Sequence, residues 1–159
     1  MGKRAHQRLR ATVGSVTALV LIGSLASCAP LISSAGCPAW AGYRTPAEAA
    51  EASAAVVFGV IQKQSGTVPM FGTTANVWTV RADAWLKGAG PDEISVVSPT
   101  ANCGPDDSAT FPDPFDEVGA QSVIIFISQS ENGWQALNPA QGIVPSPDGR
   151  IPDAWPETP

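Results

Sequence analysis

Side chains that could carry out nucleophilic or metal chemistry are scarce in this chain. His6 is the only histidine, so the sequence after it holds no imidazole for a Ser–His or Cys–His nucleophile pair or for a histidine-ligated zinc. Cys37 and Cys103 are too far apart in sequence for a local redox pair. No glycine-rich phosphate loop follows a strand pattern. The common catalytic machineries are therefore excluded.

Carboxylates remain, and five of them crowd one acidic loop. Oxygen-rich loops can bind calcium, but this spacing matches no calcium-ligand pattern and two prolines interrupt it. We therefore favour a solvated loop over a calcium site. Paired-carboxylate glycoside chemistry would need two acids across a cleft, which no pattern indicates. The sequence predicts no catalytic residue, no metal and no cofactor. The five acids are Asp106, Asp107, Asp113, Asp116 and Glu117, and the prolines are Pro112 and Pro114.

Tryptophans could line a sugar or peptide groove, although in a small β domain they more often pack in the core. Trp78 and Trp85 fall in strand patterns, which favours the core. Trp134 lies beside a turn and is expected to be the most exposed tryptophan of the domain. Trp155 lies in a proline-rich tail, which it can dock. The candidate binding surface consists of Trp134, Asp106 and Asp107.

The start of the chain has the pattern of an export signal. Lys3, Arg4, Arg8 and Arg10 precede any acid, and residues 11–26 form an apolar stretch that ends on small residues. This order is typical of a signal peptide. A retained transmembrane helix is the alternative, but it needs roughly 20 apolar residues. This stretch is shorter and diluted by glycine, serine and threonine, so we expect residues 1–27 to be removed.

The end of that stretch carries a sharper motif. Leu25-Ala26-Ser27-Cys28 resembles the bacterial lipobox, in which a leucine and two small residues precede a cysteine. The resemblance implies that Cys28 carries a diacylglycerol and becomes the first residue after cleavage. Two or more acyl chains attach a protein stably to a membrane. We therefore expect a lipid-anchored protein on the extracytoplasmic face of the cell membrane. An ordinary secretory peptide, with Cys28 left as a thiol, is the alternative.

Removal of residues 1–27 leaves 132 residues, which suits one domain. Four of the nine basic residues leave and all fourteen acids stay, so the net charge becomes −9. Nucleic-acid binding rests on neutralising phosphates, which an acidic chain with five scattered cations does poorly. Attraction to an anionic membrane surface by charge is excluded for the same reason.

If Cys28 is acylated, Cys37 and Cys103 are left over. Outside the cytoplasm a disulfide between them can form and persist. It would close a loop of 66 residues and, by chain-entropy reasoning, stabilise the fold by about 3–4 kcal/mol. Two free buried thiols are the alternative.

Periodicity predicts one short helix and five strands. Thr45, Pro46 and Glu48 have the spacing of a capping box with proline in the first turn, so a helix should run to about residue 52. Gly59 is expected to mark a bulge. The last long apolar stretch should be the central strand. Five strands and a helix predict a mainly β domain, a small barrel or sandwich. The strands are expected at residues 54–61, 73–86, 94–97, 122–128 and 134–137.

Composition also divides the chain. We expect a signal peptide over residues 1–27, a lipidated N-terminus and tether over 28–43, the β domain over 44–144 and a disordered proline-rich tail over 145–159. Trp40 and Tyr43 indicate that the far end of the tether already packs on the domain.

Five motifs follow one another along the chain: the helix and strand of residues 48–61, Ala84-Trp85-Leu86-Lys87-Gly88, Glu93-Ile94, Asn102-Cys103-Gly104 and Phe115-Asp116-Glu117-Val118-Gly119. In this order they are similar to the netrin-like module, the OB-fold barrel shared with tissue inhibitors of metalloproteinases. The resemblance covers residues 37–142. The chain departs from the family pattern in two places, because Leu86 is inserted between Trp85 and Lys87 and residues 106–114 lengthen one loop.

The resemblance implies a five-stranded OB-like barrel and a disulfide that joins Cys37 to Cys103. In that family an N-terminal cysteine chelates the zinc of a protease. Cys37 is preceded by at least nine residues of the mature chain, and Cys28 is expected to be lipidated, so protease inhibition is disfavoured.

The sequence thus favours a lipid-anchored, non-enzymatic domain that binds a protein or an envelope polymer. The alternative is a structural envelope lipoprotein that docks another membrane protein. An enzyme would have to work with carboxylates alone.

A non-reducing peptide map of protein extracted from membranes tests the anchor and the disulfide together. We expect a diacylated Cys28 at the N-terminus and a cross-link between Cys37 and Cys103. An unmodified Cys28 that is paired with either of the other cysteines would contradict both expectations.

Overall fold

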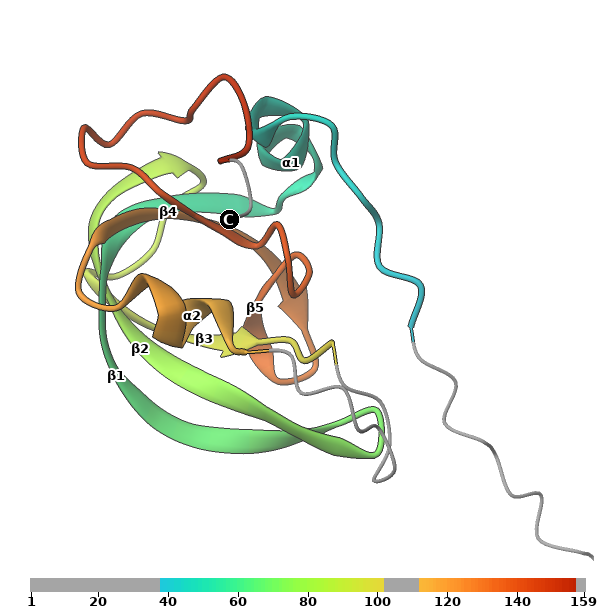
Figure 1. The fold of residues 1–159 in the computed structure, drawn as a ribbon. Helices are drawn as coiled ribbons and strands as arrows, with labels where there is room; N and C mark the ends of the chain where they lie inside the picture. The colour runs from blue at the N-terminus through green and yellow to red at the C-terminus, as the bar shows by residue number, and fades with distance from the viewer. Residues whose placement is uncertain (1–37, 102–111, 157–159) are drawn as a thin grey trace, which may run out of the picture. The chain divides into compact units, whose positions relative to one another are not determined.

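The computed structural model describes residues 38–101 and 112–156, and these form a mainly β domain with two short helices (Figure 1). Cys28, Cys37, Cys103, Asp106 and Asp107 lie outside the described residues. The elements are α1 (Pro46–Ala52), β1 (Ala55–Met70), β2 (Thr73–Lys87), β3 (Glu93–Ser98), α2 (Pro114–Val118), β4 (Ser122–Ser130), β5 (Gly133–Ala136) and β6 (Ile143–Pro145).

Five of the six strands close a ring through backbone hydrogen bonds. Strand β1 pairs with β2, β2 with β3, β3 with β5, β5 with β4, and β4 returns to β1. Only the β3–β5 pair is parallel. The short strand β6, which the sequence did not predict, pairs with the first part of β4. The predictions of a mainly β domain and of a short N-terminal helix are confirmed.

Strand β4 is buried on both of its faces. Val123, Ile125 and Ile127 point into the core inside the ring, whereas Ile124 and Phe126 belong to a second cluster with Ala49 of α1. All five of these β4 side chains have no exposed surface. Burial of such a side chain contributes about 1.5–3 kcal/mol. Two-faced burial explains why this strand is an unbroken apolar run instead of an alternating pattern.

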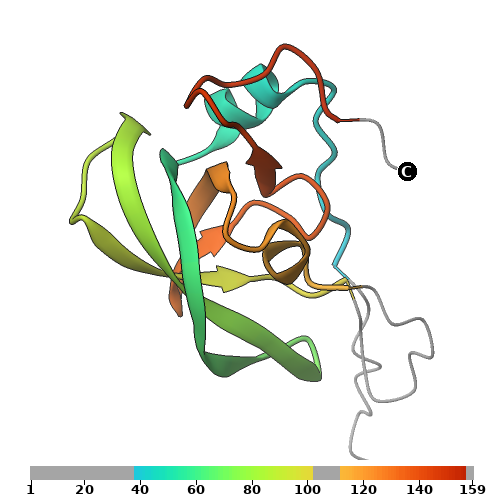
Figure 2. The same cartoon turned by 60° about the vertical axis from the view of Figure 1, so that its left-hand side comes forward.

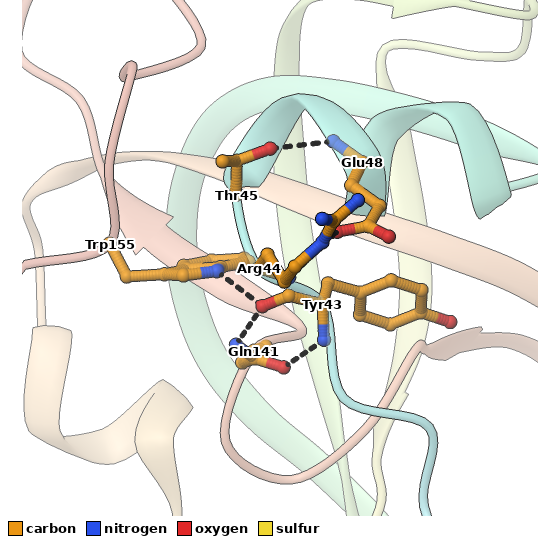
Figure 3. Close-up of polar contacts among 6 residues, drawn as sticks. All are labelled: Tyr43, Arg44, Thr45, Glu48, Gln141 and Trp155. Carbon is orange, nitrogen blue, oxygen red and sulfur yellow. Dashed lines mark hydrogen bonds and ion pairs between the residues drawn. The ribbon is translucent and has the colours of Figure 1, made fainter.

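Helix α1 begins as its sequence predicts (Figure 3). The Thr45 hydroxyl accepts a hydrogen bond from the Glu48 backbone N–H at 3.2 Å. The Glu48 carboxylate in turn accepts the backbone N–H of Arg44 at 2.8 Å, one residue before the cap. This backbone hydrogen bond lowers the pKa of Glu48 below its ordinary value. At the other end of the helix, the Lys87 ammonium donates to the carbonyls of Ala50, Glu51 and Ser53.

Strand β1 is longer than its apolar pattern. The apolar stretch ends at Ile61, yet the strand continues to Met70 and pairs with β2 as far as Met70 and Thr73. Residues 62–67 are exposed. Their backbones are held by the partner strand, so their side chains need no apolar periodicity, and sequence patterning could not find them.

The proline-rich tail differs from the expected disordered segment over its described residues. Ser146 is 2% exposed; its backbone N–H donates to the Ser122 carbonyl and its hydroxyl to the Arg150 carbonyl. Ile151 and Trp155 pack on the cluster beneath α1. Two apolar side chains and a few hydrogen bonds thus hold a segment whose composition alone indicated disorder.

Gly59 lies at an expected irregularity, which the structure confirms as a register shift between β1 and β2 at Phe58 and Gly59. An added Cβ would stand 2.1 Å from the Arg81 carbonyl oxygen, so the backbone of β2 would have to move. We expect Gly59→Ala to lower the free energy of unfolding by about 2 kcal/mol or more.

The matched control for Gly59→Ala is Gly66→Ala in the same strand. No atom lies within 4 Å of the Cβ position at Gly66. Denaturant unfolding should therefore show little change or a gain of up to about 1 kcal/mol for the control. Similar losses in both variants would contradict the close-approach argument.

Candidate functional site

One cleft of about 660 Å³ opens where β2 begins, β3 ends and α2 begins. Prolines and other small side chains form most of its wall, and Asn76, Ser98 and Asp113 bring polar groups to it. Glu117 adds a second carboxylate. The described lining comprises residues 74–76, 98–101, 112–114, 117, 139 and 140.

The Asp113 carboxylate is the centre of the polar groups in this cleft. One oxygen accepts from the Asn76 amide at 2.8 Å and from the Trp78 indole N–H at 2.9 Å. The other oxygen accepts from the Ser98 hydroxyl at 2.7 Å and from the Phe115 backbone N–H at 2.9 Å. A carboxylate has about four acceptor positions, so these four donors occupy its capacity.

Asp113 is therefore a cross-link and a helix cap. It is the N-cap residue of α2, and Pro114 occupies the first turn of that helix. Phe115 follows it into the core and stacks on Trp78 with ring centroids 6.3 Å apart. A general base needs a free lone pair aimed at a substrate proton, and Asp113 has none to offer.

The acidic loop is only partly described, and its described acids do different things. Asp113 points inward to its four donors. Asp116 and Glu117 are exposed in the first turn of α2, where the helix dipole stabilises negative charge. Within residues 38–101 and 112–156, no group of three or more acidic, histidine or cysteine side chains could hold a metal ion. Asp106 and Asp107 lie outside the described residues, so their assignment to a binding surface stays a prediction.

The tryptophans are distributed mostly as their sequence positions predict. Trp78 is 8% exposed and belongs to the core. Trp85 and Trp134 are half-buried, pack on that core and lie 6.1 Å apart between ring centroids. The Trp134 side chain is thus less exposed than expected, and it does not line the cleft. Trp155 docks the tail, as predicted, edge-to-face on Phe126.

A clamp of side chains, which no sequence pattern predicted, holds the incoming chain at Tyr43 (Figure 3). The Gln141 amide accepts the Tyr43 backbone N–H at 2.8 Å and donates to the Tyr43 carbonyl at 2.7 Å. The Trp155 indole donates to the same carbonyl at 2.9 Å. Asn138 donates to the Ala41 carbonyl at 2.8 Å. The end of the tether is therefore fixed to residues about 100 positions away in sequence.

Asp113 could have been singled out from the sequence. Asp113-Pro114 repeats the arrangement of Thr45-Pro46, a capping side chain followed by proline, and this arrangement identified α1. The clamp had no such signal, because Gln141 and Asn138 lie in a loop without periodicity.

Comparison of the chain with protein-family models, with curated proteins and with solved structures gives no match. Among the residues that the structure describes, no helix is long and apolar enough to cross a membrane.

Asp113→Asn tests the cross-link. Each carboxylate oxygen serves one partner that can only donate, the Trp78 indole or the Phe115 backbone N–H. An asparagine has a single acceptor oxygen, so one of these buried donors must lose its partner. We expect the free energy of unfolding to fall by about 2–3 kcal/mol, measured by denaturant titration.

Asp116→Asn is the control for Asp113→Asn, since it removes an exposed carboxylate from the same helix. Its effect should stay within about 1 kcal/mol. Equal losses for the two variants would mean that charge near the helix, and not the four hydrogen bonds, is what matters.

Proposed function

We propose that this chain is a lipid-anchored, extracytoplasmic binding domain without catalytic activity, and that the cleft around Asp113 is its ligand site. The observation that carries the proposal is the saturated carboxylate. The polar centre of the cleft is fully used to hold the walls together, so the cleft offers a fixed shape and no free base. Such a cleft suits recognition better than turnover.

The domain is proposed to be an OB-like barrel. In support, the ring runs in the order β1-β2-β3-β5-β4 and back to β1, with α2 between β3 and β4. OB barrels bind ligands on the face of their second and third strands and on the flanking loops. The cleft draws residues from β2, from the end of β3 and from the loop after β5. The chemistry of recognition is set by the lining residues and not by the fold.

The lining indicates the kind of ligand. Four prolines and several small side chains make an apolar wall, and the ionisable groups in the described lining are the carboxylates Asp113 and Glu117. The mature chain has a net charge of −9. An extended, neutral or cationic segment of a protein or envelope polymer fits this surface, whereas a polyanion would be repelled.

The clamp fixes the place from which the proposed anchor segment would leave the domain. Ala41 lies thirteen positions after Cys28, and at full extension this segment reaches at most about 45 Å. Because Asn138 holds Ala41 and Gln141 holds Tyr43, the tether leaves the domain from one fixed place. A lipid on Cys28 would thus keep the cleft close to the membrane, where envelope polymers and membrane proteins lie.

A photo-reactive benzophenone amino acid at position 140 tests the cleft. Ala140 is exposed and lines the cleft, and its backbone N–H bond to Asn138 would remain. Irradiation of whole cells should then produce a cross-linked band, or retention of the chain on isolated envelope polymer. The two results distinguish a protein ligand from a polymer.

The control for position 140 is the same amino acid at Ala47, which is exposed on α1 and does not line the cleft. It should yield no such product. Cross-linking from both positions, or from neither, would argue against the cleft as the ligand site.

A further inference from the structure

The β1–β2 ribbon ends in a turn with unusual backbone geometry. Phe71 and Gly72 form the turn with φ of 49° and 81°. Positive φ at both positions is the geometry of a type I′ hairpin, in which asparagine or aspartate normally precedes the glycine. Phe71 is the one non-glycine residue with positive φ in the described chain. An aromatic side chain in this position costs about 1–2 kcal/mol, so the geometry of the turn alone does not explain why it is there.

The ribbon tip presents apolar surface. Phe71 is 40% exposed. Trp40 lies edge-to-face on it, with ring centroids 5.9 Å apart. Behind the turn, Met70, Ala75 and Val97 form a small buried cluster that supports the end of the ribbon. The two aromatic rings therefore lie on a packed part of the domain. Figure 2 shows the β1–β2 ribbon extending past β3 and α2.

The outer part of the ribbon also carries no charge. The seventeen residues from Gln64 to Val80 include no ionisable side chain, although the mature chain holds fourteen acids. Lys63 and Arg81 bound this uncharged segment. A surface meant only for water would not need such a segment, whereas a surface that enters the interfacial zone of a bilayer must avoid carboxylates.

We propose that this tip, made of Phe71 and Trp40, seats in the headgroup region of the same bilayer that holds the lipid on Cys28. The inference rests on the proposed lipid anchor. Trp40 lies only twelve positions after Cys28, so the tip would stay within about 40 Å of the bilayer at all times. Tethering makes the second contact intramolecular, and a weak contact then suffices to orient the domain.

A bilayer fits this tip better than a protein does. Tryptophan prefers the interface between membrane and water, where its ring is buried and its N–H stays wet. Thr74, which lines the cleft, is three residues from Phe71, about 10 Å along the strand. Seating of the tip would therefore hold the cleft beside the membrane surface, and ligands would be recognised there.

Quenching by brominated lipid tests the contact. The lipidated chain is reconstituted into phosphatidylcholine vesicles with or without bromines on the acyl chains, and its tryptophan emission is compared. The bromines should quench part of the wild-type emission. Trp40→Phe should lose most of that quenched part, because it removes the tryptophan at the tip. Trp155→Phe also removes one tryptophan, but this tryptophan packs under α1 and not at the tip. The Trp155→Phe variant should therefore keep the quenched part of the emission.

Phe71→Asn provides the second variant. Asparagine tolerates positive φ, so the turn should fold at least as well, and the loss of the aromatic ring should reduce the quenching. Equal emission with brominated and plain lipid, from protein that floats with the vesicles, would overturn the proposal and leave the anchor intact. Equal quenching in wild type and Trp40→Phe would overturn it too. Protein that fails to float would overturn both the anchor and the seated tip.

Discussion

The four hydrogen bonds to Asp113 are the constraint on which the cleft end of this domain depends. The Trp78 indole is inside the core, and a buried N–H without an acceptor costs about 1–3 kcal/mol. Asp113 supplies that acceptor, and the same carboxylate begins α2 and fixes Ser98 at the end of β3. The cap, the aromatic stack of Phe115 on Trp78 and the cleft wall therefore form or fail together.

The opposite end of the ring is closed by packing. Trp85 and Trp134 stack on the core, and Gly90 lies so close to the Trp85 ring that an added Cβ would meet it at 2.3 Å. With aromatic side chains at both ends and aliphatic side chains between them, a five-stranded ring has no room inside for a ligand. A ligand of this domain would therefore meet it on the outside, where the cleft and the ribbon tip lie.

The predictable parts of the fold are those whose burial or capping requires a recognisable pattern of residue types. Strand β4, buried on both faces, and α1, with its cap, were found. The outer part of β1 was not, since its order comes from backbone pairing and its side chains face water. The role of Asp113 as a cross-link was not predictable either. The Asp113-Pro114 pair could have marked a helix cap, but composition cannot show which acid of a cluster meets four donors. Trp134 was expected to be exposed. Its strand, β5, pairs with both β3 and β4, and this pairing places the Trp134 ring on the core.

The tail shows why a low-complexity composition need not mean disorder. Proline restricts the unfolded chain, so a segment such as residues 145–156 loses less entropy when it is ordered. A few contacts then suffice to hold it, and they are the Ser146 hydrogen bonds, Ile151 on the cluster and Trp155 between Phe126 and the Tyr43 carbonyl. The last of these contacts joins the two ends of the domain. The tail thus acts on the incoming chain, since Trp155 helps Gln141 to fix the backbone of Tyr43 just before α1.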